Sequence, residues 1–362
     1  MRDDIPLEAF SQAVLDWFAA NRRALPWRAH YEPYSTWIAE MMLQQTQMER
    51  GVSYFSRWME QFPDIASVAE ASEETLLRAW EGLGYYRRVR HIQAAARQIM
   101  ADHQGVFPAS LEAIRALPGI GEYTAAAIAS TAFEQDIACV DGNVERVLAR
   151  VFDIDLPLRQ GSGKTLIRDL ARKLLPPGKA RDFNQGLMEF GALVCRKKPL
   201  CQECPVRFLC EAFRLDIVRE RPLPGCSVPI TQAEVVAGVL RHNDRFFVQR
   251  RQLDDRVWAG LWEFPGGMVE QGESPEQAIV REFHEEVEYA VTIVRPIGLI
   301  RHNYTSYRLS LYCFEVTFTD ARPDAPEPVL HEACDWRWAT AEEISRLPLP
   351  ASHRKLAELC GL

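Results

Sequence analysis

The spacing of apolar residues changes once along the 362-residue chain, and this change constrains the fold more than any other feature. Through residues 7–215, apolar residues recur at three- and four-residue spacing, as on one face of an α-helix. The proline-rich stretch 221–229 that follows is typical of a linker. Beyond it, runs rich in β-branched and aromatic residues predict strands. We therefore predict an all-α domain over residues 1–218, a linker over 219–230 and an α+β domain over 231–362.

The individual segments follow from the same spacing. The helix-like segments are Leu7–Ala20, Tyr34–Met59, Glu73–Trp80, Arg90–Asp102, Thr124–Ala132 and Ser274–Val287, and the strand-like ones are Glu234–Leu240, Arg245–Arg250, Val291–Ile300 and Ser310–Thr317. The stretch Gly161–Thr165 looks like the end of a phosphate-binding loop, but Leu158 stands where that motif needs glycine. We expect it to be a loop between helices.

The net charge of −8 is unfavourable for a protein that binds DNA, but the charge is unevenly distributed. The first 225 residues carry 28 Lys and Arg against 29 Asp and Glu, whereas the remaining residues carry 14 against 21. Because phosphate contacts depend on local patches, the basic clusters at residues 87–90 and 196–198 leave nucleic-acid binding open.

Other features of composition bear on the compartment. No apolar run approaches the ~20 residues that cross a membrane, and the N-terminus lacks an apolar signal core. The nine cysteines are an odd number, which argues against a disulfide framework. We expect a cytoplasmic protein without a membrane partner, associated with the nucleoid if its source is bacterial.

Four cysteines gather within sixteen residues, in the pattern Cys195-x5-Cys201-x2-Cys204-x5-Cys210. Such clustering is improbable by chance, and thiolates select zinc or iron–sulfur clusters. The pattern therefore predicts a metal centre near the end of the all-α domain.

A short turn, Leu-Pro-Gly-Ile-Gly at residues 117–121, joins two helix-like segments. The proline ends the first helix, and Gly119 and Gly121 permit a tight turn with positive φ. The N–H groups at the start of the next helix would then point outward and suit a DNA phosphate. A plain connection between helices is the alternative for this turn taken alone.

Asp141 lies twenty residues after this turn, just before another helix-like segment. A helix–hairpin–helix followed by this aspartate resembles the endonuclease III superfamily of DNA glycosylases. Members that also cleave the strand have a lysine two residues after the second glycine, where this chain has Tyr123. The resemblance thus implies a monofunctional glycosylase. A helix N-cap is the alternative role for Asp141, and one aspartate can serve both.

Within that superfamily, residues 37–46 (WIAEMMLQQT) and 82–86 (GLGYY) resemble the adenine DNA glycosylases of the MutY type. The resemblance implies that Glu40 protonates N7 of adenine while Asp141 stabilises the oxocarbenium-like sugar or bonds to it transiently. Tyr123 and Asn143 would orient the two carboxyls. Apolar neighbours favour a partly buried Glu40 with a raised pKa, although most helical glutamates are simply solvated.

The same resemblance assigns residues to the DNA, from which the base must be flipped. It places four in the adenine pocket and three on the minor-groove side, where an intruding side chain fills the gap. The first are Trp27, Arg28, Leu43 and Gln185, and the second are Gln45, Thr46 and Tyr85. Core packing is the alternative for any one aromatic, and we favour it for Trp27 taken alone.

The resemblance also makes the four cysteines, in a loop over residues 195–210, the ligands of a [4Fe-4S] cluster that closes the helical domain. The family has six residues in the first gap and this chain has five, so zinc remains an alternative. The basic residues of this loop could contact phosphate; they are Arg196, Lys197, Lys198 and Arg207.

The second domain carries the pattern Gly267-x5-Glu273-x7-Arg281-Glu-Phe-His-Glu-Glu, which resembles the box of MutT-like Nudix hydrolases. MutY-type proteins have such a domain for recognising oxidised guanine. Either the glutamates are remnants on a solvated helix face, or Glu285 and Glu286 still bind Mg²⁺. Glu288 replaces the terminal glycine of the box, which disfavours the left-handed turn there.

A loop that often reads Phe-Ser-His in the family contacts the damaged base. Here the matching stretch after His302 is Tyr304–Thr305–Ser306, which lacks the histidine. We predict Tyr304 and Thr305 as contacts.

We predict a monomeric base-excision glycosylase that acts on duplex DNA carrying adenine opposite 8-oxoguanine or guanine. The alternatives are a thymine-mismatch glycosylase, a Nudix hydrolase with a DNA-targeting module, and an inactive mismatch-binding protein. Glu40 and the second domain argue against the first, and the pair Glu40 and Asp141 argues against the last.

Overall fold

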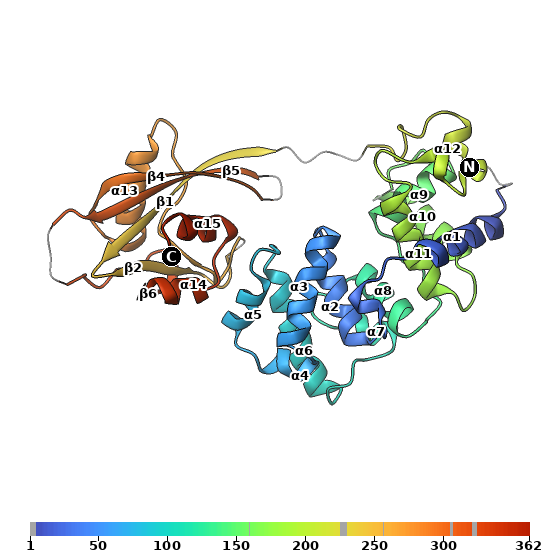
Figure 1. The fold of residues 1–362 in the computed structure, drawn as a ribbon, viewed down its shortest axis with the longest axis horizontal. Coiled ribbons are helices and arrows are strands. Elements are labelled where there is room, and N and C mark those ends of the chain that lie inside the picture. Colours follow the sequence, from blue (N-terminus) through green and yellow to red (C-terminus); the bar gives the residue numbers. More distant parts are fainter. Residues whose placement is uncertain (1–4, 159, 225–229, 256, 305–306, 321–323) are drawn as a thin grey trace. The chain divides into compact units, whose positions relative to one another are not determined.

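The computed structural model describes residues 5–158, 160–224, 230–255, 257–304, 307–320 and 324–362. Contacts divide the chain into two compact units (Figure 1). The first comprises Met1–Glu70 with His91–Ser227, and the second comprises Ala71–Arg90 with Val228–Leu362. The domain limits predicted above stay a prediction, and the structure adds that a segment of the helical half packs with the second unit.

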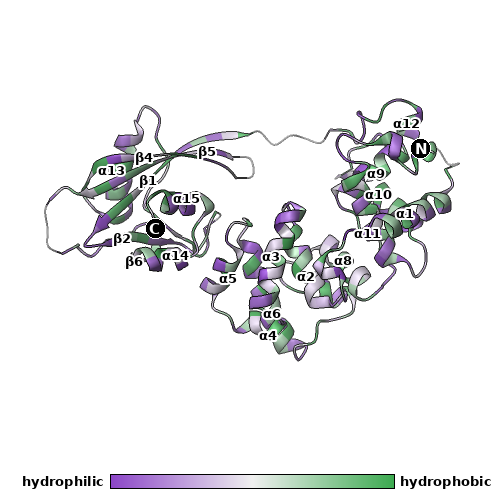
Figure 2. Cartoon of the chain, viewed as in Figure 1, coloured by the Kyte–Doolittle hydropathy of each residue, from purple (hydrophilic) through white to green (hydrophobic). Residues whose placement is uncertain are grey.

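The first unit is helical, as its periodicity predicts. Its helices are α1 (Leu7–Asn21), α2 (Pro33–Leu43), α3 (Met48–Gln61), α4 (Ile65–Glu70), α7 (Leu111–Arg115), α8 (Glu122–Ala132), α9 (Gly142–Val151), α10 (Gly161–Leu174), α11 (Ala180–Leu193) and α12 (Glu211–Arg214), with short 3-10 turns η1 (Pro26–Arg28), η2 (Cys201–Glu203) and η3 (Arg207–Leu209). Hydrophilic and hydrophobic residues are interspersed along these helices (Figure 2), as amphipathic helices require. No helix among the described residues has both the length and the apolar character needed to cross a bilayer.

Two predicted segments differ from the structure. Residues 34–59 are not continuous, because Gln45 adopts a left-handed conformation with φ of 57° and separates α2 from α3. Residues 161–165 begin α10 and are not a loop. A side chain at Gly163 would lie 2.1 Å from the carbonyl oxygen of Pro157, so the glycine permits a close approach there rather than phosphate binding.

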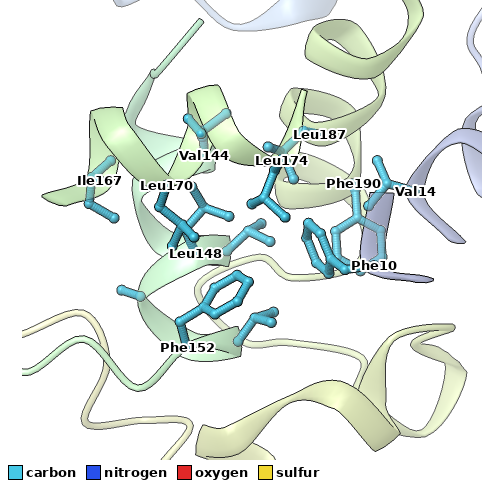
Figure 3. Packing of buried hydrophobic residues seen from close by; sticks show 14 of the residues in the cluster. Phe10, Val14, Val144, Leu148, Phe152, Ile167, Leu170, Leu174, Leu187 and Phe190 are labelled. Atoms are coloured by element: carbon cyan, nitrogen blue, oxygen red, sulfur yellow. The ribbon is translucent and has the colours of Figure 1, made fainter. Parts of the chain in front are cut away.

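One apolar core joins α1, α9, α10 and α11 (Figure 3). Phe10, Leu148 and Phe190 are fully buried in it. Each such side chain contributes roughly 1.5–3 kcal/mol through burial. This packing fixes the start of α9 beside α11, which matters for the site described below.

The second unit contains a mixed six-stranded sheet with the order β3-β2-β1-β5-β4, in which β6 pairs with β2. Its strands are β1 (Thr231–His242), β2 (Arg245–Arg251), β3 (Trp262–Glu263), β4 (Val291–Tyr304), β5 (Tyr307–Phe318) and β6 (Ala333–Ala339). Strand β1 runs parallel to β5, from Thr231 opposite Tyr307 to Leu240 opposite Val316, and the other pairs are antiparallel.

Helices cover both faces of this sheet. Alternate residues of β1 point to opposite faces, so Val236 and Leu240 pack with α13 (Pro275–Val287), while Ala237 and Val239 pack with α14 (Ala341–Arg346) and α15 (Ala351–Leu359). Gly238 faces α13, where a side chain would lie 2.4 Å from the ring of Phe283. The α+β architecture predicted for this domain from the sequence is confirmed.

Residues 71–90 of the second unit contain α5 (Glu73–Trp80) and the first turn of α6 (Arg87–Asp102). Ser72 caps α5, because its side chain accepts a hydrogen bond from the N–H of Thr75. Leu76, Leu77 and Trp80 are buried, while Tyr85, in the turn between the two helices, is half-buried with φ of 49°.

Candidate active site

A cavity of about 360 Å³ in the first unit is formed by η1, α2, α8, α9 and α11. Ten of the residues predicted from the sequence line it. They are Trp27, Arg28, Glu40, Leu43, Gln45, Thr46, Tyr123, Asp141, Asn143 and Gln185. The structure therefore brings both predicted carboxyls into one cavity with all four residues of the predicted adenine pocket.

Glu40 projects from α2 into this cavity and is half-buried. Burial raises the pKa of its carboxyl to about 7, and the nearby Asp141 acts in the same direction. A hydrogen bond from the Tyr123 hydroxyl and the positive charge of Arg28 oppose the rise in the pKa. Glu40 is thus a carboxyl that can hold a proton near neutral pH and give it to a bound base.

Asp141 is the N-cap of α9. Its Oδ1 accepts hydrogen bonds from the N–H groups of Asn143 at 2.9 Å and Val144 at 2.8 Å. Its Oδ2 accepts one from Asn143 Nδ2 at 2.8 Å. Burial raises the pKa of Asp141, and these hydrogen bonds oppose that rise. The capping alternative therefore holds, and the capping carboxylate also lines the cavity.

Arg146 fixes the amide of Asn143, and the sequence did not single it out. Its Nη2 donates to Asn143 Oδ1 at 2.8 Å and to the carbonyl of Gly191 at 2.7 Å, and its Nε donates to the carbonyl of Cys195 at 2.8 Å. Because the Asn143 oxygen is engaged, its NH2 group is directed at Asp141. The three-residue spacing from Asn143 along α9 is the one signal that could have found it.

Gly191 allows α11 to approach α9 at this point. A side chain there would lie 2.7 Å from Asn143 Cβ and 3.0 Å from its carbonyl oxygen. We expect Gly191→Ala to shift Asn143, to lower the free energy of unfolding by about 1–3 kcal/mol and to slow base release, because Asp141 moves with Asn143. Urea unfolding and single-turnover excision would measure the two effects.

Gly186→Ala on the same helix is the matched control, because its added methyl group meets the side chain of Phe18 at 3.0 Å and leaves Asn143 untouched. Gly186→Ala should lower the free energy of unfolding but slow single-turnover excision less than Gly191→Ala does. Equal slowing in both variants would show that Gly191 acts only through stability.

Another part of the cavity wall is a network of charged and polar side chains. Arg28 Nε donates to Gln185 Oε1 at 2.6 Å, and its Nη1 donates to Glu189 Oε1 at 2.9 Å. Arg23 pairs with the same carboxylate at 2.8 Å. Glu189 is 3% exposed and lies one turn beyond Gln185 on α11. The sequence identified Arg28 and Gln185 but missed Arg23 and Glu189, whose helical spacing from Gln185 was the available signal.

Trp27 combines both of its predicted roles. It is 9% exposed and packs edge-to-face on Phe55 with ring centroids 5.2 Å apart. It also lines the cavity. Packing fixes the indole there.

Of the other predicted residues that the structure describes, Gly119, Gly121 and Tyr85 do not line the cavity. Gly119 has φ of 74°, as the hairpin prediction requires, and a side chain there would meet His91 at 2.4 Å. Gly121 has φ of −85°, so its predicted positive φ is wrong, because it is the extended N-cap of α8. Tyr85 belongs to the second unit. Thr305 and the side chain of Tyr304 lie outside the described residues.

Comparison with known proteins gives two matching families. The HhH-GPD superfamily of base excision DNA repair proteins matches residues 38–200, and the NUDIX domain matches residues 235–359. The adenine DNA glycosylase of Rattus norvegicus is 32% identical over 98% of this chain and 78% of its own length. That of Homo sapiens is 30% identical over 98% of this chain and 74% of its own length.

The chain belongs to the adenine DNA glycosylase family.

Solved structures agree with this fold for the helical part. A thermostable thymine-DNA glycosylase is 30% identical, with a TM-score of 0.54, over 58% of this chain and 97% of its own. An endonuclease III–DNA complex, at 22% identity and a TM-score of 0.50, shows the same fold over 57% of this chain and 95% of its own.

The four cysteines of this adenine DNA glycosylase line one small cavity together with Arg150. Arg150 Nη1 donates to Cys195 Sγ at 3.4 Å and to the carbonyl of Arg196 at 2.8 Å. Among the described residues, no three His, Cys, Asp or Glu side chains converge as a single metal ion requires. A four-iron cluster makes a different demand, because each of its irons takes a separate thiolate.

The two glutamates of α13 that were predicted to bind Mg²⁺, Glu285 and Glu286, lie in different environments in this family member. Glu285 is exposed and pairs with Arg281 at 2.7 Å. Glu286 is buried and accepts hydrogen bonds from Gln249 Nε2 and the N–H of Gly266, each at 2.9 Å. Burial raises the pKa of Glu286.

The end of α13 differs from expectation. Glu288 adopts the left-handed conformation, with φ of 56° and ψ of 28°, although it is not glycine. Its Oε1 lies 2.9 Å from His331 Nε2. The turn that the glycine would favour is therefore retained.

Proposed function

We propose that this protein hydrolyses the bond between adenine and deoxyribose in duplex DNA, where adenine is paired with 8-oxoguanine or guanine. The observation that carries the proposal is the convergence of Glu40 and Asp141 on one cavity, each with its own orienting partner. The volume of about 360 Å³ is at the small end of ligand sites and suits a single purine base.

The chemistry requires two carboxyls in different states. Adenine is a poor leaving group, so Glu40 gives a proton to N7 as the glycosidic bond breaks. Asp141 carries the negative charge that stabilises the oxocarbenium-like sugar or bonds to it transiently, and water then completes the hydrolysis. Tyr123 and Asn143 hold the two carboxyls by the hydrogen bonds described above.

The reaction stops at base release in this proposal. Strand cleavage through a Schiff base needs an amine nucleophile, and the position that supplies it in related enzymes is Tyr123. The Tyr123 hydroxyl is buried, which raises its pKa well above the usual range. It therefore donates hydrogen bonds and is not a nucleophile.

We also propose that Cys195, Cys201, Cys204 and Cys210 hold a [4Fe-4S] cluster. Their shared cavity and thiolate donor set support this, despite the short first gap. When bound, such a cluster would close the loop structurally and supply no step of the hydrolysis. Arg150 and Arg146 already tie the backbone of Cys195 to α9.

The second domain would read the base opposite adenine, and the protein would act on DNA as a monomer. Tyr304 and Thr305 remain the predicted contacts.

Two observations argue against a Mg²⁺ site at Glu285 and Glu286. Arg281 forms ion pairs with Glu285 and with two other glutamates, Glu273 and Glu282. Glu286 already accepts hydrogen bonds from a backbone N–H and a side-chain amide. These contacts therefore indicate a structural role for the glutamates.

The deciding experiment incubates the purified protein, without magnesium, with duplexes that carry adenine opposite 8-oxoguanine, guanine or thymine, and then adds alkali. Cleavage at adenine opposite 8-oxoguanine and guanine, with much less opposite thymine, supports the proposal. A fourth duplex with thymine opposite guanine tests the activity named for one structural relative. Release of thymine alone would replace the proposal.

The pH dependence of excision tests the role of Glu40 as the acid. Its pKa of about 7 means that the proton is present below pH 7 and lost above it. Under single-turnover conditions the rate constant should fall about tenfold per pH unit above that value, because only the protonated enzyme reacts. A rate constant that stays flat from pH 6 to 9 would contradict this.

A further inference from the structure

Residues 71–90 are tied to the rest of the second unit through a mostly buried ion pair. Glu81, at the end of α5, accepts hydrogen bonds from Arg354 Nε at 2.6 Å and Nη2 at 3.1 Å, and from the N–H of Leu349 at 3.2 Å. The side chains of Glu81 and Arg354 are 9% and 15% exposed. Arg354 lies in α15 and also donates to the carbonyls of Ile344 and Leu347. The pair is thus embedded in a network and is not a loose surface contact.

A second set of contacts holds the start of α6 to the same unit. Arg90 Nε pairs with Glu73 at 2.7 Å, and its Nη2 donates to the carbonyl of Ala259. Gly260 has no side chain, and one built there would lie 2.6 Å from Arg90 Nη2. Both ends of the turn between α5 and α6 are therefore anchored to residues of the second domain.

The turn between these anchors is held by three hydrogen bonds. The carbonyl of Gly84 accepts hydrogen bonds from Trp80 Nε1 at 3.1 Å and from Arg88 Nη2 at 3.0 Å. The Tyr86 hydroxyl donates to the carbonyl of Leu349 at 3.4 Å. Tyr85 lies between these contacts in the left-handed region, which a non-glycine residue keeps only where its surroundings impose it.

We propose that Arg354 is a positioning residue for Tyr85. Its ion pair with Glu81 fixes the base of the turn, so the side chain expected on the minor-groove side of the DNA is held by the C-terminal domain. The C-terminal domain would thereby influence mispair binding through Tyr85 as well as through its own surface. This inference rests on the proposed function, because Tyr85 has its DNA role only there.

A double-mutant cycle on the full-length protein tests the inference. The variants are Tyr85→Ala, Arg354→Ala and the pair, and the measurement is the Kd for a duplex with a non-hydrolysable 2′-fluoro adenosine opposite 8-oxoguanine. Arg354→Ala should raise the Kd by about threefold to tenfold. The Kd of the double variant should be no higher than that of whichever single variant binds the duplex more weakly. Effects that multiply would show independent action and overturn the inference, as would an unchanged Kd for Arg354→Ala.

Two further variants separate positioning from general effects. Arg346→Ala removes the same charge from the same domain, at an exposed pair with Glu342, and should leave the Kd within about twofold. Equal weakening by Arg346→Ala would mean that bulk charge matters, which overturns the inference. Glu81→Gln keeps the size of the side chain and an acceptor for Leu349, so it replaces Arg354→Ala in the cycle if that variant does not fold.

The outcome is separable from that of the proposed function. A wild-type protein that binds the mispair but releases no adenine would contradict the proposed reaction, and the Kd cycle could still be completed. A wild-type protein that releases adenine normally, with multiplicative effects in the cycle, would contradict only the role of Arg354.

Discussion

Glu40→Gln should bind mispaired duplex as the wild type does and leave the adenine in place. The amide keeps the shape of the side chain and an oxygen that can accept the Tyr123 hydrogen bond, but it carries no acidic proton. General acid catalysis contributes about 10²- to 10⁴-fold, so the single-turnover rate constant should fall by that factor. Excision assayed by alkaline cleavage, with binding measured on the same duplex, would check this.

Glu32→Gln provides the matched control for Glu40→Gln, because it makes the same change at an exposed residue just before α2. It should leave both excision and binding unchanged. Near-normal excision by Glu40→Gln would exclude Glu40 as the proton donor and direct attention to another group in the cavity.

Asp141→Asn should also abolish base release while leaving α9 intact. Asparagine is as good an N-cap as aspartate, so hydrogen bonds from Asn143 and Val144 can persist and stability should change little. What is lost is the negative charge beside the developing sugar cation. We expect a loss of at least about 10²-fold in the single-turnover rate constant, the scale at which a preorganised electrostatic group acts.

Comparison with Asp141→Ala separates the two roles of this residue. Alanine removes both the charge and the cap, so it should cost a further ~1 kcal/mol in the free energy of unfolding, measured in urea. If Asp141→Asn retains excision while Asp141→Ala loses it, the carboxylate serves α9 alone and does not stabilise the sugar.

Much of the site was predictable from the sequence because short local motifs carry the resemblance to the family, and that resemblance assigned the residues. Glu40 lies among apolar residues on one helix, and Asp141 precedes another, so their character could be inferred from neighbours in the chain. Ten of the residues that the resemblance assigned line one cavity. Periodicity likewise identified α5, β2 and α13 to within a residue or two.

The parts that were missed depend on packing between distant segments. Arg146 matters because Gly191 brings α11 against Asn143, and Glu189 matters because Arg23 and Arg28 meet there. These contacts join residues that are far apart in the sequence, so no local pattern predicts them. The break between α2 and α3 was missed for a different reason, since apolar spacing continues through the left-handed Gln45.

The membership of residues 71–90 in the second unit has a consequence for how the chain is made. Glu81 is translated 273 residues before its partner Arg354. At about 5–20 residues per second, Arg354 is added roughly 14 to 55 s after Glu81, and the ion pair cannot form before then. Until then Glu81 and Arg90 lack the partners that residues 259–354 supply. A chain that stops near the linker would therefore keep α5 and α6 but lose the contacts that hold both ends of the turn carrying Tyr85.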